Sequence, residues 1–132
     1  MNKDIQDTVE NWKALSEYDY DSAGIMLKNG KYLYVCFMCQ QCIEKILKGI
    51  YVSKIQKTPP YTHNLQRLLS NLSDYVTLSE ADQRILEMLS YYYMESRYAE
   101  QIREAVQIIT EEKATNIYFS TKALFECLRN KI

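Results

Sequence analysis

Apolar residues recur at steps of three and four along most of the chain, and no stretch alternates apolar and polar residues as a half-buried strand does. The first such run covers residues 4–28 and stops at Asn29 and Gly30, residue types that tolerate the left-handed conformation at a helix C-terminus. The positions along its inner face are Ile5, Val9, Trp12, Ser16, Asp19, Ala23 and Leu27. The pattern predicts a long helix whose inner face includes one carboxylate.

The remaining runs predict further helices joined by short breaks. A long second helix should end ahead of Pro59 and Pro60, because the residue before a proline disfavours helical geometry. In order, the later predicted helices cover about 32–57, a short piece within 61–72, 79 to about 97, and 110 onward. The stretch at 97–108 has no clear assignment. We therefore expect one all-α domain over residues 1–132, an up-and-down four-helix bundle with an additional short helix.

Composition and charge narrow the possible partners. The 132 residues are 47% hydrophobic and 25% charged, with a formal net charge of -1. This balance gives no general attraction to DNA or to an acidic membrane surface. The N-terminal residues lack the apolar core of a signal peptide, and no apolar run approaches the roughly 20 residues of a membrane span. We expect a cytoplasmic protein with no cofactor.

Three of the four cysteines, Cys36, Cys39 and Cys42, stand three residues apart in the second helix. On a helix they fan over roughly 120° of the same side that carries the isoleucines of this segment. A metal or cluster site needs sulfurs that converge on a point and a fourth ligand, and Cys127 lies far along the chain. A redox pair would need a strand leading into a helix N-terminus. We predict buried apolar thiols and no metal.

The other side of the second helix carries Gln41, Glu44, Lys45 and Lys48, which share a face. A solvated charged face is the simplest interpretation, and a binding surface is the alternative. Just before it, apolar residues continue the outward side, so that this half of the helix must be covered on both sides. A homodimer or partner interface would provide that cover. The candidate interface residues are Tyr34, Phe37, Met38 and Gln41.

Asp19 is out of place on the apolar face of the first helix. A buried carboxylate costs several kcal/mol unless it is neutralised or paired. We predict a buried polar pair with Arg97 as the first choice of partner, and a lysine or His63 as the second. The pair would either fix the first helix against the bundle or belong to a binding site.

These segments together resemble the HEPN domain family. The resemblance rests on the tryptophan-bearing first helix, a Gln-Gln-x-x-Glu-Lys-x-x-Lys helix, a Thr-His-x-Leu segment and an Arg-Tyr pair after the fourth helix. In this sequence those positions are Trp12, Asp19, Ala23, Gly30, Tyr32, Gln40, Gln41, Glu44, Lys45, Lys48, Thr62, His63, Leu65, Arg97 and Tyr98. The resemblance covers nearly the whole chain and implies the same helical bundle.

What the resemblance implies for function divides in two. Many HEPN proteins are metal-independent ribonucleases, often toxins, with an arginine followed four to six residues later by histidine. Here the only histidine, His63, precedes every arginine, of which Arg67 is the first. The usual acid–base pair is therefore missing. Other members are small stand-alone proteins, commonly encoded beside a minimal nucleotidyltransferase and proposed to bind a nucleotide or to assist that enzyme.

We therefore expect a non-catalytic protein that binds a nucleotide or acts as an accessory subunit of a minimal nucleotidyltransferase, including within a toxin–antitoxin pair. The alternatives are a HEPN ribonuclease and a structural dimerisation module. The candidate residues for nucleotide or partner binding are Lys45, Lys48, Arg97, Tyr98 and His63, with no catalytic residue assigned. Lysine and arginine would meet a phosphate, and tyrosine would stack on a base.

Overall fold

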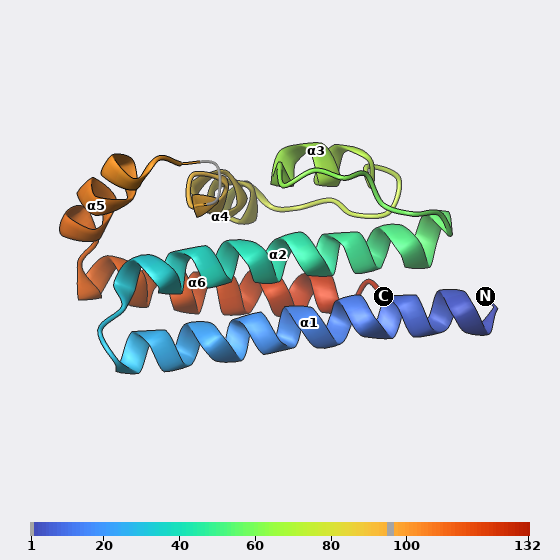
Figure 1. The fold of residues 1–132 in the computed structure, drawn as a ribbon. Helices are drawn as coiled ribbons and strands as arrows, with labels where there is room; N and C mark the ends of the chain where they lie inside the picture. Colours follow the sequence, from blue (N-terminus) through green and yellow to red (C-terminus); the bar gives the residue numbers. More distant parts are fainter. Residues whose placement is uncertain (1, 95–96) are drawn as a thin grey trace.

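The structure is a computed structural model that describes residues 2–94 and 97–132, and these residues form helices and no strands. The elements are α1 (Lys3–Lys28), α2 (Tyr32–Ile55), α3 (Leu65–Ser70), α4 (Glu80–Ser90), α5 (Ala99–Ile108) and α6 (Glu111–Arg129). Figure 1 shows three long helices, α1, α2 and α6, lying side by side, with α3, α4 and α5 along one side of them. The all-α fold predicted from the sequence is confirmed.

Three short helices, α3, α4 and α5, take the place of the third long helix of the expected bundle. In Figure 1, α1 runs from right to left and α2 returns, then α3, α4 and α5 lead the chain back before α6 runs in the same direction as α2. This keeps the up-and-down order, with short helices in place of one long one. Helix α4 is shorter than predicted: it ends at Ser90 and not near Arg97. The chain turns there, so that Tyr92 enters the core while Tyr93 meets His63.

The turn between α1 and α2 is set by its sequence. The N–H of Lys31 donates to the carbonyl of Met26 at 2.9 Å, and the N–H of Gly30 donates to the carbonyl of Leu27 at 3.4 Å. This pair of bonds is the Schellman motif, and it requires a left-handed residue, which is Gly30 with φ of 75°. The hairpin places α1 along the full length of α2.

Helix α2 is the centre of the molecule. It contacts α1, α3, α4, α5 and α6, and most of its residues are buried, with Tyr34 and Lys54 exposed. Gly49 permits the close packing of α1, because a Cβ at this position would lie 3.2 Å from the Cβ of Trp12. The polar residues Gln40, Glu44 and Lys48 are on the covered part of this helix, so they require partners inside the protein.

Among the described residues, no helix is both long and apolar enough to cross a membrane.

Candidate functional site

A buried carboxylate on α2 organises a cluster of polar side chains. Glu44 is 3% exposed, and both of its oxygens have partners. Lys48 Nζ donates to Oε2 at 3.2 Å, while Gln40 Nε2 donates to Oε1 at 3.3 Å. The residues are spaced four apart, which places them on one face of the helix. We call Gln40, Glu44, Lys48 and His63 the Glu44 cluster.

His63 joins the cluster from the loop between α2 and α3. Its Nδ1 lies 3.0 Å from Glu44 Oε1, and its backbone carbonyl accepts a bond from Gln40 Nε2 at 3.3 Å. The ring of Tyr93 stacks on the imidazole with centroids 4.1 Å apart, and Tyr61 approaches its edge at 5.8 Å. The imidazole is therefore held by a carboxylate at one nitrogen and by an aromatic ring over its face, while the side chain stays 32% exposed.

The cluster overturns the expectation of a solvated face on α2. Lys48 is 6% exposed and its ammonium lies 5.6 Å from the centre of the Trp12 ring. Charge and cation–π contact both hold it inside the protein, so it offers no free cation for a phosphate. The covering elements are α1 and the loop that carries His63, which lie far from α2's polar residues in the sequence.

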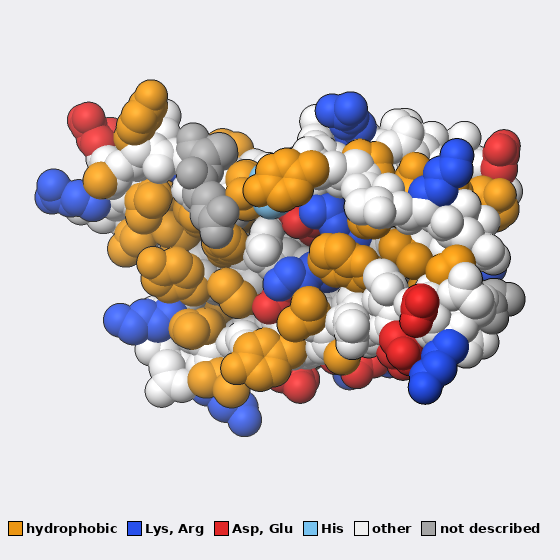
Figure 2. All heavy atoms as spheres, turned by 45° about the vertical axis from the view of Figure 1, so that its right-hand side comes forward, with side chains coloured by type: hydrophobic (Ala, Val, Ile, Leu, Met, Phe, Trp, Pro, Cys, Tyr) orange, Lys and Arg blue, Asp and Glu red, His pale blue; other side chains and the backbone are white. Residues whose placement is uncertain are grey.

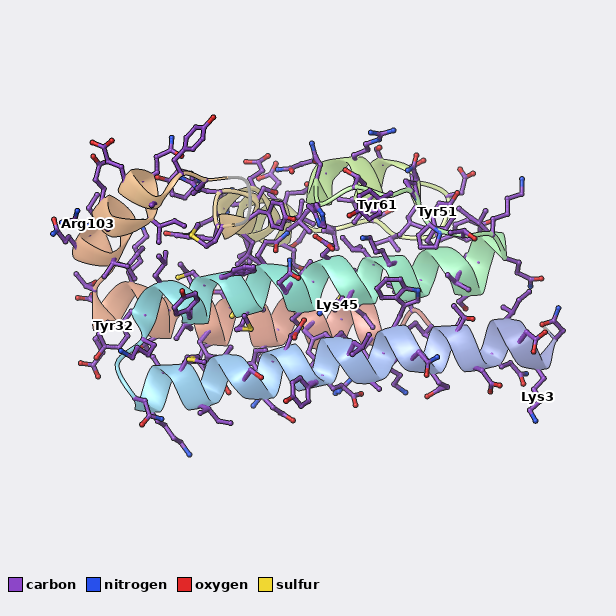
Figure 3. The ribbon with its side chains drawn as sticks, in the orientation of Figure 1. Lys3, Tyr32, Lys45, Tyr51, Tyr61 and Arg103 are labelled. Atoms are coloured by element: carbon purple, nitrogen blue, oxygen red, sulfur yellow. The ribbon has the colours of Figure 1, made fainter. Side chains whose placement is uncertain are left out.

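Asp19 pairs with Lys45 and not with Arg97. Lys45 Nζ lies 2.6 Å from Asp19 Oδ2, in a partly buried bridge between α1 and α2. The first choice of partner was wrong, and the second, a lysine, is what the structure shows. The physical reason is proximity, because α1 and α2 form a hairpin that brings these two side chains together. Figure 3 shows Lys45 on α2, toward α1.

Arg97 and Tyr98 lie in the segment that leads into α5. The guanidinium of Arg97 stacks 3.9 Å from the ring centre of Tyr91, and its Nη2 donates to the carbonyl of Tyr91. Tyr98 is 81% exposed, and its backbone N–H donates to Gln101 Oε1 at 3.0 Å. No contact among the described residues joins either side chain to the Glu44 cluster. Of the five predicted binding residues, the structure brings together only Lys48 and His63, which both contact Glu44.

A polar pocket of about 240 Å³ opens beside the cluster. His63, Asn64 and Gln66 line it from the start of α3, Ser90 from the end of α4, and Tyr93 from the turn that follows. Ser90 Oγ lies 2.7 Å from Gln66 Oε1 and bridges the two helices.

Of the five residues that line this pocket, only His63 is among the candidate binding residues predicted from the sequence. Asn64 carries a detectable signal, because its side chain caps α3 by accepting from the N–H of Arg67 at 3.0 Å. No local sequence pattern marks Gln66 and Ser90, because their hydrogen bond joins residues 24 apart on two short helices.

Comparison with known proteins decides the family. The HEPN domain family matches residues 9–131, which is nearly the whole chain. The chain belongs to the HEPN family. Two solved structures share the fold. TT1696 from Thermus thermophilus has a TM-score of 0.79 at 22% identity, covering 94% of this chain and 98% of its own. ST0689, described as an archaeal HEPN homologue, has a TM-score of 0.72 at 24% identity, covering 92% and 95%. No curated protein matches the chain.

The cysteines of this HEPN chain fill its core. Cys36, Cys39 and Cys42 are fully buried, as predicted, and Cys127 is partly exposed. Burial raises the pKa of the Cys36 and Cys39 thiols to about 12, and raises the pKa of Cys42 well above its usual value. Among the described residues, no three His, Cys, Asp or Glu side chains gather where they could hold a metal ion.

The candidate interface residues of α2 divide into covered and open ones. Phe37 is 8% exposed and meets Tyr93 edge-on at 6.2 Å, so its cover comes from this same chain and not from a partner. Gln41 is partly buried and donates to Gln40 Oε1 at 2.7 Å. Met38 is also partly buried, whereas Tyr34 stays 48% exposed. The expectation that Phe37 needs a partner is corrected.

Proposed function

We propose that this HEPN protein is a non-catalytic binding protein that takes a nucleotide or serves as the accessory subunit of a minimal nucleotidyltransferase, including within a toxin–antitoxin pair. One observation carries the proposal. The charged groups of the Glu44 cluster pair with one another inside the protein. Hydrogen-bonding groups of His63, Asn64 and Gln66 border a surface pocket. Such an arrangement supports holding a ligand in a defined orientation.

The positions of histidine and arginine favour binding over ribonuclease activity. His63 is tied to Glu44 at Nδ1, and Arg97 lies on Tyr91. Metal-independent HEPN ribonucleases need an arginine and a following histidine in one site, and this chain has no histidine after an arginine. The histidine that would complete the acid–base pair with an arginine is therefore missing from this sequence.

Nucleotide binding is tested by calorimetry and thermal unfolding with the four ribonucleoside monophosphates. We expect at least one to bind and to raise Tm as its concentration increases. Gln66→Ala should weaken that binding, whereas Gln107→Ala, an exposed glutamine on α5, should not. RNA cleavage without metal that disappears in Arg97→Ala would overturn the non-catalytic assignment.

The accessory role is tested by co-expression with a minimal nucleotidyltransferase encoded beside this chain. We expect the two to co-elute in size-exclusion chromatography at a fixed stoichiometry. Separate elution at tens of micromolar would contradict this part of the proposal.

We also propose that copies of the chain associate through the first half of α2. Tyr34 keeps 48% of its surface exposed there, and Figure 2 shows hydrophobic side chains gathered at the end of the molecule near α5. Light scattering should give a dimer for the wild type and a monomer for Tyr34→Lys. Tyr75→Lys, at a tyrosine that is 46% exposed elsewhere, should stay dimeric. A wild-type monomer at high micromolar concentration would refute the interface.

A further inference from the structure

The hydrogen bonds inside the pocket wall determine which atoms remain for a ligand. Asn64 Oδ1 accepts from the N–H of Arg67 at 3.0 Å, so its Nδ2 group is left with two donors. Ser90 Oγ lies 2.7 Å from Gln66 Oε1 and 3.0 Å from the Leu86 carbonyl. The hydroxyl donates along the shorter contact, which leaves Gln66 Nε2 as a second donor group.

His63 supplies the complementary acceptor. The carboxylate of Glu44 already accepts from Lys48 and Gln40, and a carboxylate can only accept. The bond between Glu44 and His63 therefore places the proton on Nδ1. With the proton on Nδ1, the ring in its neutral form carries its lone pair on Nε2, and no contact from the described residues reaches that atom.

The pocket is small, and no lysine, arginine or carboxylate of the described residues lines it. Beside His63 it is lined by Asn64, Gln66, Ser90 and Tyr93. A phosphate would need cations or several backbone N–H groups, which this wall does not present. Its volume of about 240 Å³ is below the roughly 300–1,000 Å³ of pockets that enclose a drug-sized ligand. One ring fits this description better than a whole nucleotide.

We propose that the pocket between α3, α4 and Tyr93 recognises the imide edge of an oxo-nucleobase, the group in which a ring N–H stands between two carbonyls. The carbonyls accept from the side-chain amides of Asn64 and Gln66, and the ring N–H donates to His63 Nε2. An imide N–H is a more acidic donor than an exocyclic amine, and it suits the basic imidazole nitrogen. This inference rests on the proposed nucleotide binding and assigns the base, rather than the phosphate, to this pocket.

The test compares uridine with cytidine and with 3-methyluridine, which keeps both carbonyls but loses the ring N–H. Calorimetry on the full chain should show uridine binding at least tenfold more tightly than either, and uridine monophosphate binding about as well as uridine. Gln66→Glu replaces a donor by an acceptor and should lower uridine affinity at least tenfold. Gln107→Glu makes the same exchange on exposed α5 and should leave the affinity unchanged.

The outcomes separate this inference from the proposed function. Equal affinity for uridine and 3-methyluridine, or binding that Gln66→Glu does not alter, overturns the imide assignment and leaves nucleotide binding in place. Binding of inorganic phosphate in competition with uridine also overturns it, because the pocket would then take the phosphate. If no nucleoside or nucleotide binds, both the assignment and nucleotide binding fail.

Discussion

His63 Nδ1 and Glu44 Oε1 lie 3.0 Å apart, and this bond joins a loop histidine to the most central helix of the protein. Glu44 is 3% exposed while the His63 side chain is 32% exposed, so the pair reaches from the interior to the surface. The buried end is anchored by Lys48 and Gln40. The outer end borders the pocket. The buried polar residues of α2 do not line the pocket, and His63 connects them to it.

The Lys48–Glu44 pair should be the most sensitive point of the cluster. Lys48→Met leaves the carboxylate of Glu44 buried without its cation, and we expect a loss of about 3–5 kcal/mol in the free energy of unfolding. Glu44→Gln combined with Lys48→Met removes both charges and should recover most of the loss. Urea denaturation measures both. Equal destabilisation in the single and double variants would show that the charges are not coupled.

Asp19→Asn should cost about 1–2 kcal/mol, because it removes a charge-assisted hydrogen bond that is partly open to solvent. Asp21→Asn is the control, since Asp21 is exposed on the same helix and should change the free energy of unfolding by no more than about 0.5 kcal/mol. The two variants are compared by urea denaturation. An Asp19→Asn protein as stable as the control would remove the proposed role of the bridge in holding α1 on α2.

Cysteine alkylation should divide the four thiols. Cys36, Cys39 and Cys42 are fully buried, whereas Cys127 is partly exposed. Mass spectrometry after brief treatment with iodoacetamide at about pH 8 should find one modification in the native protein and four after unfolding in urea. Cys127→Ser should show none in the native state. Rapid native labelling of the other three would place them outside the core.

Because these thiols are buried, we expect the free energy of unfolding to fall at alkaline pH. Burial raises the pKa of Cys36 and Cys39 to about 12, from 9.0 in an exposed thiol. Above about pH 9 the unfolded chain releases these protons while the folded chain retains them, so the free energy of unfolding falls as pH rises from 9 to 12. We expect a loss of about 1 kcal/mol per core thiol between about pH 8 and 10. Cys39→Ala should show a smaller pH slope, and an unchanged slope would refute this origin.

The helices were readable from the sequence wherever periodicity and caps agree. The boundaries of α1, the end of α2 before the prolines and the start of α6 at Thr110 all follow the pattern. The end of α4 does not, because tertiary contacts of Tyr92 and Tyr93 turn the chain where the local sequence would continue the helix. The short helix α5 lies where the pattern is ambiguous.

The site was predictable only in part. The spacing of Gln40, Glu44 and Lys48 marks one face of α2, yet local sequence cannot show that a loop from residues 56–64 covers it. Charged residues at helical spacing usually face solvent. Here the loop covers Glu44 and Lys48, and Glu44 binds His63 from inside the protein. The pairing of Gln66 with Ser90 depends on how α3 and α4 pack, which no local pattern encodes.

The central claim is that Glu44 holds His63 with its Nε2 lone pair facing a ligand. His63 is the only histidine, so selective ¹⁵N labelling of histidine gives one unambiguous imidazole in an NMR spectrum. We predict the Nδ1–H tautomer near neutral pH and a shift of the Nε2 resonance when uridine is added. The Nε2–H tautomer, or an Nε2 resonance unmoved at saturating uridine, would contradict the claim.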